Sequence, residues 1–340
     1  MDFRLTDDQR ALRAGVRELL EGRFPRERLR AVVDAGAPVV DRALWRELGG
    51  AGFFALRLAE ADGGVGLGLP EAVLVFEEAG RALLPGPLVA THLAAGVVEG
   101  AAGGRAVVTA LDAAGPLVEH LASADAVLVI GDEGDEGDDE GDGAGGGIGV
   151  LSAAGLARSA RPIRSVDPAT PLHRLDLGSR PGQEERGLAA FPADPRSTAR
   201  LRREAALLTA ALQLGSAART VEMAVRHAGE RSQFGRAIGA FQAVQHLCAG
   251  MLVRVETARS VVYAAAVTED AGEVTAAKLL ADEAAVRNAR DCLQVHGGMG
   301  FTWEADVHLH LKRAWVRAGQ WQTAAEAEEE LAAGLLRIGV

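Results

Sequence analysis

The sequence predicts a mostly helical α+β protein. It comprises an N-terminal helical domain (residues 1–102), a small middle β domain (103–194) and a C-terminal four-helix bundle (195–340). Three observations predict this fold class. Apolar residues recur at helical spacing through the first domain, short β-branched segments follow, and four long helix-like segments fill the remainder. Consecutive long helices joined by short links are typical of an up-down bundle.

The N-terminal domain carries local signals of helix starts and ends. Thr6 and Gln9 form a capping-box pattern, TDDQ, ahead of an apolar stripe. A second helix is expected to begin at Asp41 and to end at a pair of glycines. A third helix should begin beside Pro70 and end before Pro85, and the stretch PLVATHLAAGVVEGA predicts one more helix.

The character of the chain changes near residue 105. The segments RAVVTAL, ADAVLVIG, IGVLSAA and HRLDL are short, β-branched or alternating, and separated by turn residues, as β-strands are. Between two of them, residues 131–147 contain eight acidic residues and no basic residue. Such a glycine-rich acidic segment cannot bury apolar area, so we expect a disordered loop there.

Composition excludes several classes of function. The net charge is −11, but it is only −3 without the acidic loop, which gives no electrostatic case for nucleic-acid binding. No stretch approaches the roughly 20 apolar residues of a membrane span, and the charged N-terminus lacks a signal-peptide pattern. Cys248 and Cys292 lack CxxC spacing and predict buried thiols. We therefore expect a cytoplasmic protein without a membrane or nucleic-acid partner.

The histidines near the C-terminal end do not predict a metal site. His308 and His310 lie close in sequence to Glu304 and Asp306, which are possible metal ligands. However, residues two apart on a helix point to different faces, so chelation by this histidine pair is not expected.

One segment of the C-terminal domain, ERSQFGRAIGAFQAVQH, interrupts the regular helical pattern. Arg231, Phe234 and Gln242 cluster there around a glycine-marked turn. The guanidinium of arginine is planar and always charged, which suits it to phosphate, and a neighbouring aromatic ring offers a face for a base. Taken alone, the segment is better explained as a helix-ending turn with a solvated arginine.

A second interruption is QVHGGMGFTWEADVHLHLKRA. Gln294 precedes Gly297, Gly298 and Gly300, and a new helix is expected to begin near Trp303. Backbone N–H groups at a helix start bind anions, and glycines remove the side chains that would block approach. One glycine-rich turn is weak evidence, but two such turns in one bundle, each beside an amide or guanidinium group, are stronger evidence for a binding site.

The two segments together resemble the C-terminal domain of the FAD-dependent acyl-CoA dehydrogenases. The N-terminal stretch DFRLTDDQRALRAGVRELL and the order of helices, β domain and helices are also similar to that family. The resemblance implies an all-α N-terminal domain, a β domain, and a C-terminal four-helix bundle that forms the dimer interface.

In that family, the pyrophosphate and adenine of FAD are held partly by the neighbouring subunit. The resemblance implies α,β-dehydrogenation of an acyl-CoA thioester, in which a glutamate removes the α-proton and the flavin accepts a hydride. It also implies an electron-transfer flavoprotein, or a similar acceptor, as a partner. The FAD-binding residues implied by the resemblance are Arg231, Phe234, Gln242, Gln294, Gly297, Gly298 and Thr323.

The sequence departs from the family at the catalytic base. Many members place the glutamate in a Tyr-Glu-Gly-Thr segment, where this chain has GQWQT, with Trp321 at the glutamate position and Thr323 retained. Other members keep it on the first helix of the C-terminal domain, at the position of Ala205, with Glu204 beside it. One residue turns a helix by about 100°, so Glu204 is the candidate base only if the register shifts. Otherwise it is a solvated charge.

The middle domain departs from the family as well. The Thr-Glu, Gly and Ser segment that contacts the flavin ring and the thioester has no counterpart in VVTALDAAGPLVEHL, and the chain is shorter than typical members. The half of the FAD site that reaches into a neighbour is thus retained. The half that would hold the chain's own flavin ring and base is not.

This asymmetry resembles the short subunits of heterotetrameric acyl-CoA dehydrogenases from bacterial breakdown of steroid side chains. There a longer partner supplies the glutamate and the flavin-ring pocket, and the short chain completes the cofactor site. We favour this role over a self-sufficient homo-oligomer (a dimer or tetramer) that acts on fatty or steroid acyl-CoA. Because a fold does not fix its chemistry, a flavin-dependent monooxygenase, a nitroalkane-type oxidase and a cofactor-free helical interaction protein are also compatible with the sequence.

Overall fold

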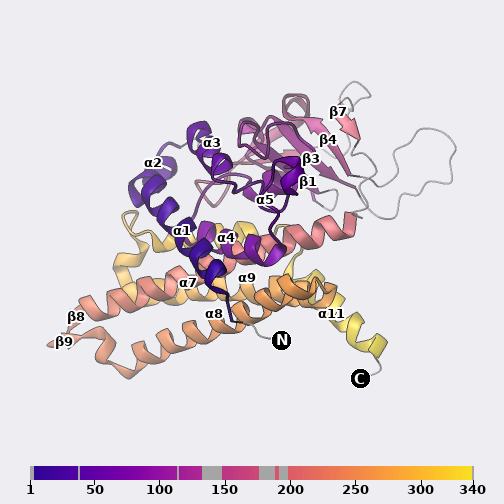
Figure 1. Cartoon of the computed structure of the whole chain (residues 1–340). Coiled ribbons are helices and arrows are strands. Elements are labelled where there is room, and N and C mark those ends of the chain that lie inside the picture. Colours follow the sequence, from indigo (N-terminus) through magenta and orange to yellow (C-terminus); the bar gives the residue numbers. More distant parts are fainter. Residues whose placement is uncertain are drawn as a thin grey trace. The chain divides into compact units, whose positions relative to one another are not determined.

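The protein is described by a computed structural model. Helices dominate it, and its strands form small sheets (Figure 1). The predicted fold class, α+β and mostly helical, is confirmed. The predicted acidic loop, residues 131–147, lies outside the described residues apart from Gly131. The residues that the structure describes are 4–36, 39–112, 115–131, 148–175, 188–190 and 198–338.

The chain folds into two compact units, each of which draws on separate parts of the sequence. The sequence predicted domains that are continuous along the chain, with boundaries after residues 102 and 194. These boundaries stay a prediction. The first unit comprises Met1–Pro25, Leu69–Leu84 and Ala206–Val340, and the second comprises Arg26–Gly68 and Pro85–Ala205.

The first unit is helical. α7 (Thr198–Glu230) belongs to it from Ala206 onward, and α7, α8 and α9 are its longest helices (Figure 1). These are three of the four long segments that the sequence predicted for a bundle, and the fourth forms only the 12-residue helix α10. The bounds of the other two long helices are Gln242–Thr268 for α8 and Ala271–His296 for α9. The shorter helices of the unit are α1 (Asp7–Arg23), α4 (Leu69–Arg81), α10 (Val307–Ala318) and α11 (Ala324–Ile338).

Several helices begin at the caps that the sequence predicts. At the start of α1, the Thr6 hydroxyl accepts the Gln9 N–H at 3.1 Å, and the Gln9 side chain accepts the Thr6 N–H at 3.0 Å. α3 (Arg42–Gly50) begins at Asp41, whose carboxylate accepts backbone N–H groups at 2.9 and 3.1 Å. Each cap satisfies N–H groups that have no partner within the helix.

α4 and α7 touch backbone to backbone at two glycines. A Cβ atom on Gly215 would lie 1.8 Å from the Glu77 carbonyl oxygen, and one on Gly80 would lie 2.0 Å from the Leu212 carbonyl oxygen. Because real Cβ atoms do not approach so closely, any larger residue at either position would force the helices apart. This contact sets the distance between α4 and the bundle.

The second unit contains two small sheets and short helices. Its four-stranded sheet has the order β1-β3-β4-β7 and its three-stranded sheet the order β2-β6-β5. β1 pairs in parallel with β3, and β3 pairs antiparallel with β4. The helices are α2 (Arg26–Asp34), α3, α5 (Leu88–Leu93) and α6 (Ala153–Leu156); the strands are β1 (Val108–Asp112), β2 (Leu117–Glu119), β3 (Ala126–Ile130), β4 (Ile148–Ser152), β5 (Ala160–Ile163), β6 (Leu172–Leu175) and β7 (Leu188–Ala190).

The four predicted strand segments correspond to β1, β3, β4 and β6, whereas the short strands β2, β5 and β7 were not predicted. The helix predicted for PLVATHLAAGVVEGA is wrong beyond Leu93. Thr91 anchors the short α5 to β1, since its hydroxyl donates to the Val108 carbonyl at 2.9 Å and accepts the Val108 N–H at 3.0 Å. The chain is therefore held by this contact with β1 instead of continuing as a longer helix.

The expectation that both cysteines are buried holds for Cys292 but not for Cys248. Both Cys248 and Cys292 are free thiols, the first half-buried and the second buried. Within the described ranges, no helix has the length and apolar character needed to cross a membrane.

Replacing Gly215 by alanine should destabilise the fold, because the new methyl group would clash with the α4 backbone. We expect the free energy of unfolding to fall by about 3 kcal/mol, measured by urea denaturation. Gly229→Ala in the same helix is the matched control, since a Cβ there meets nothing within 4 Å. That variant should be equal to the natural protein or about 0.5 kcal/mol more stable. Equal stability of the two variants would contradict the packing described.

Candidate functional site

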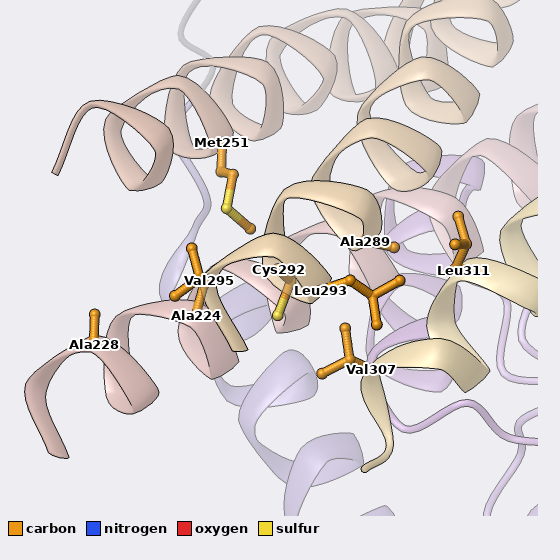
Figure 2. Close-up of a cluster of buried hydrophobic side chains, with 9 residues drawn as sticks. All are labelled: Ala224, Ala228, Met251, Ala289, Cys292, Leu293, Val295, Val307 and Leu311. Atoms are coloured by element: carbon orange, nitrogen blue, oxygen red, sulfur yellow. The ribbon is translucent and has the colours of Figure 1, made fainter. Parts of the chain in front are cut away.

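The two interrupted segments of the sequence come together at one end of the helical bundle. An apolar cluster joins them, and it is drawn from four helices, α7, α8, α9 and α10 (Figure 2). Small side chains such as Ala224, Ala228 and Ala289 let these helices approach closely. The buried members of the cluster are Ala224, Ala228, Met251, Ala289, Cys292, Leu293, Val295, Val307 and Leu311.

The first segment forms a tight hairpin after α7. The Arg231 N–H donates to the His227 carbonyl at 2.9 Å and ends the helix, and β8 (Ser232–Gln233) then pairs with β9 (Arg236–Ala237). The two residues between the strands, Phe234 and Gly235, have φ values of 52° and 78°. Two left-handed residues are the requirement of a two-residue hairpin turn, and asparagine or glycine usually fills them. A phenylalanine at this position is therefore unusual.

The hairpin presents polar and aromatic groups outward. Phe234 is 92% exposed, which forgoes about 2 kcal/mol of burial. Arg231 and Gln242 are also exposed, and the structure gives the Arg231 guanidinium no ion-pair partner among the described residues. Phe241 precedes α8 and offers no side-chain cap, so N–H groups at the start of α8 can donate to a ligand instead.

The second segment forms a turn at the end of α9. Gly297 has a φ of 59° and ends the helix, and Gln294 is exposed on its last turn. A Cβ atom on Gly297 or Gly298 would meet nothing within 4 Å, whereas one on Gly300 would lie 3.0 Å from His296 Cβ. The first two glycines therefore leave open space beside the backbone, and Gly300 serves internal packing.

The helix expected near Trp303 begins later. A short 3-10 helix spans Gly297–Phe301, and α10 starts only at Val307. The delay follows from a local turn, since the Thr302 N–H and hydroxyl both donate to the Met299 carbonyl, at 3.1 and 2.9 Å. The glycine turn therefore does not open directly into a helix.

Two imidazole rings connect the hairpin with the glycine turn. His227 on α7 and His296 on α9 stack with their ring centroids 4.1 Å apart and an interplanar angle of 18°. Six of the residues that the sequence singled out therefore belong to two segments joined at this end of the bundle. They are Arg231, Phe234, Gln242, Gln294, Gly297 and Gly298.

Thr323 lies at the other end of α9. The turn that carries it is held by Lys278, whose Nζ donates to the Gln322 carbonyl at 3.2 Å. Lys278 precedes Gln294 by 16 residues on the same helix, which corresponds to about 24 Å at the rise of an α-helix. The β8–β9 hairpin and α11 accordingly lie at opposite ends of the bundle (Figure 1). The structure does not bring Thr323 to the hairpin.

A local role accounts for Thr323. Its hydroxyl donates to Glu326 Oε2 at 2.8 Å and its N–H donates to the same oxygen at 2.7 Å, which begins α11. These two hydrogen bonds lower the pKa of the Glu326 carboxyl. A capping role of this kind occurs at many helix starts, so the retained threonine alone says little about a cofactor.

Trp321 occupies a strained turn. Its φ is 65°, and the Gln322 N–H donates to the Gln320 carbonyl at 2.8 Å, so Trp321 is the centre of a three-residue turn. Turns of this hand are rare and strained for a bulky residue. Lys278 also holds the start of this turn, since it donates to the Arg317 carbonyl at 3.3 Å. An indole cannot remove a proton from a substrate.

The buried charges that support this turn were not predicted from the sequence. Lys278 is 1% exposed and forms an ion pair with Asp282, one helical turn away. Gln213 on α7 donates to the other Asp282 oxygen at 2.9 Å. Burial raises the pKa of the Asp282 carboxyl, and the lysine opposes that shift. A lysine and an aspartate spaced four apart inside the apolar stretch VTAAKLLADEAA were the available signal.

Glu204 is not the solvated charge that one interpretation expected. It is 3% exposed, and both carboxylate oxygens accept hydrogen bonds from arginines. Arg57 donates to Oε2 at 2.8 Å and to Oε1 at 3.3 Å, and Arg200 donates to Oε1 at 3.2 Å. Ala205 beside it is buried as well. Oxygens committed to two guanidinium groups are typical of a structural ion pair.

The histidines of α10 have separate environments, as their spacing predicted. His310 is buried and shares a hydrogen bond of 2.8 Å with the Ser216 hydroxyl, while His308 stacks on Trp303. Burial, together with the charges of nearby arginines, lowers the pKa of His310 to about 3. Within the described part of the chain, no group of three or more metal-ligating side chains gathers.

Comparison with known proteins gives consistent matches over most of the chain. Residues 6–102 match the family model of the acyl-CoA dehydrogenase N-terminal domain, and residues 198–319 match that of the acyl-CoA dehydrogenase C-terminal domain. The chain is similar to acyl-CoA dehydrogenase IpdE2 of Mycobacterium tuberculosis, with 34% identity over 277 residues, which are 81% of this chain and 80% of that protein.

Two further matches differ in how much of the other protein they cover. Acyl-CoA dehydrogenase FadE34 of Mycobacterium tuberculosis is 35% identical over 289 residues, which cover 80% of this chain but only 39% of that longer protein. Among solved structures, a variant of the steroid ACAD Tcur3481-Tcur3483 has a TM-score of 0.79 at 25% identity. The alignment covers 97% of this chain and 98% of the matched chain.

Glycine and alanine at position 321 should separate the strain of the turn from the packing of the indole. Both Trp321→Gly and Trp321→Ala remove the ring, but only glycine adopts a positive φ without strain. We expect the glycine variant to be more stable than the alanine variant by about 1 kcal/mol, measured by thermal and urea unfolding. An alanine variant as stable as the glycine variant would show that the turn is not strained.

Proposed function

The chain belongs to the acyl-CoA dehydrogenase family of oxidoreductases, and from this premise we propose that it serves as a short subunit in the α,β-dehydrogenation of an acyl-CoA thioester. In this role the chain completes the FAD site of a longer catalytic partner. The hairpin and the glycine turn hold the diphosphate end of the cofactor. Further partners are the acyl-CoA substrate and an electron-transfer flavoprotein or a similar acceptor.

The residues at the hairpin end of the bundle fit the diphosphate of FAD. A diphosphate needs positive charge and several N–H donors within a short distance. The exposed Arg231 guanidinium supplies the charge, and the uncapped start of α8 at Gln242 supplies backbone N–H groups. Gly297 and Gly298 leave the approach to the backbone open, and Gln294 lies beside them. The presence of these donors on two segments that the His227–His296 stack joins is the observation that carries the proposal.

The rest of a dehydrogenase site has little support in this chain. FAD supplies the electron-accepting ring when it is bound, and the reaction also requires a base for the α-proton. Trp321 cannot act as a base, and Glu204 is committed to Arg57 and Arg200. We therefore assign the base to the longer partner.

The exposure of the hairpin supports a site that is shared between chains. Phe234 is 92% exposed and Arg231 and Gln242 are exposed, so one face of the bound cofactor would remain uncovered by this unit. A second chain that covers this face would bury the aromatic side chain and exclude water from the diphosphate.

Two relatives support a longer partner. The steroid ACAD Tcur3481-Tcur3483 carries two chain names in one assembly. In FadE34, the region that matches this chain is only 39% of the protein, so a longer stretch of protein accompanies it. Both arrangements place a chain of this kind beside additional sequence, which is what a short subunit requires. A steroid acyl-CoA is the substrate class that the first relative suggests.

Loss of the Arg231 side chain should weaken FAD binding. In the assembly with a longer acyl-CoA dehydrogenase chain, Arg231→Ala should lower FAD affinity about tenfold or more, because a charge-assisted contact is lost. FAD absorbance per chain and flavin fluorescence measure the effect, and circular dichroism verifies folding. Arg226→Ala is the matched control, since Arg226 is exposed on α7, the helix that Arg231 directly follows. Equal occupancy of both variants would remove the half-site assignment.

The role of Glu204 can be separated from that of a base by comparing both members of its ion pair. Glu204→Gln and Arg57→Gln should each lower the free energy of unfolding by about 1–3 kcal/mol, because the partner charge stays partly buried. Turnover per bound FAD should stay within about twofold in both variants. If Glu204→Gln abolishes turnover while Arg57→Gln retains it, Glu204 is the base and our assignment fails.

A further inference from the structure

The stacked imidazoles lie where the two segments of the FAD half-site meet. His227 is on the last turn of α7, and its carbonyl accepts the Arg231 N–H at 2.9 Å. His296 is the last residue of α9 and directly precedes Gly297. The rings are nearly parallel and 4.1 Å apart, so they are in contact over their faces. The stack therefore links the helix end that precedes Arg231 with the residue that precedes Gly297.

The orientation of His296 is fixed by its own helix. Its Nδ1 lies 2.8 Å from the Cys292 carbonyl, which can only accept, so Nδ1 carries a proton and donates it. The same nitrogen is 3.6 Å from the Cys292 sulfur. The ring is thus held against α9, and its face is turned to His227. The His296 ring thus has a fixed orientation, and the His227 ring packs on its face.

We propose that the His227–His296 stack is a positioning element that holds the Arg231 hairpin and the Gly297 turn in register for FAD, and that it releases them when His227 becomes charged. This inference rests on the proposed FAD half-site. Neither histidine contacts the cofactor in this account. Both act through the neighbouring backbone.

The surroundings of the stack disfavour a positive charge on His227. Burial lowers the pKa of His227, the neighbouring His296 and Arg231 lower it further, and Glu230 opposes them. α10 faces the cluster with Val307 and Leu311. The remaining titratable groups near the stack are the thiols of Cys292 on α9 and Cys248 on α8, both with pKa values raised by burial, and Asp291 on α9, which raises them further.

The direction of the pH dependence follows from the lowered pKa. Above the ordinary histidine value of 6.5, His227 is neutral in the folded and unfolded protein, and the stack contributes its full stability. As the pH falls below that value, the unfolded chain binds the proton more readily, and the contribution is lost. A charged His227 would also lie beside Arg231 and 4.1 Å from His296, which separates the two segments.

The test compares two variants of His227. One has a ring that cannot titrate, and the other has a side chain that cannot stack. FAD affinity of the assembled protein is measured by flavin fluorescence at about pH 8 and about pH 5.5, on either side of the histidine range. The natural protein should bind FAD at least about fivefold more weakly at the lower pH. His227→Phe keeps a stacked ring and should show little pH dependence, whereas His227→Ala should bind weakly at both pH values.

His173→Phe is the control, since it removes a half-buried histidine of the second unit whose pKa is also lowered by burial. Its pH profile should equal that of the natural protein. A His227→Phe variant with the natural pH profile, or a His227→Ala variant with natural affinity at both pH values, would overturn the proposal.

A second readout does not depend on FAD. Hydrogen exchange at Gly297–Phe301, corrected for its intrinsic pH dependence, reports whether the glycine turn stays ordered. The turn should lose protection at about pH 5.5 in the natural protein and keep it in His227→Phe. If this result appears in an assembly that binds no FAD at any pH, the proposed function fails and the stack keeps its positioning role. If the protection of the glycine turn is unchanged at the lower pH in both proteins, the proposed role of the stack is contradicted.

Discussion

The candidate site depends on the apolar contact between the end of α7 and the end of α9. Arg231 and Gln294 are separated by a whole antiparallel pair of helices in the sequence. They belong to one end of the bundle because buried apolar side chains of α7, α8, α9 and α10 pack together there (Figure 2). The polar side chains of the half-site contribute little to this packing, since most of them are exposed to solvent. The bundle core therefore positions the half-site. The exposed side chains of the hairpin and the glycine turn can differ in chemical type without a change in this core.

The length of α9 divides the predicted site residues into two groups. Lys278 holds the Trp321 turn near the beginning of the helix, and Gln294 lies near its end, about 24 Å away. One group supplies N–H donors and an arginine at the surface, and the other supplies a strained tryptophan where a base would be required. In our proposal, this division is the physical reason for a second chain, because the two ends of one helix cannot close around the same part of a cofactor.

Local features were predictable from the sequence, and tertiary partners were not. The capping box at Thr6, the helix start at Asp41 and the long bundle helices follow from residue type and spacing alone. Arg57 is 147 residues from Glu204 in the chain, so nothing near Glu204 could reveal that its charge is buried and paired. The positive φ of Trp321 likewise has no local signal, because the residue is not one that favours that conformation.

The flavin content of the chain, alone and with a longer acyl-CoA dehydrogenase chain, tests the central claim most directly. The visible absorption spectrum and native mass of both preparations give the number of FAD molecules per chain. We predict a colourless chain when it is purified alone, and a yellow assembly, bleached by acyl-CoA, when the longer chain is present. A lone chain that binds FAD and is bleached by acyl-CoA would contradict the account and establish a self-sufficient enzyme.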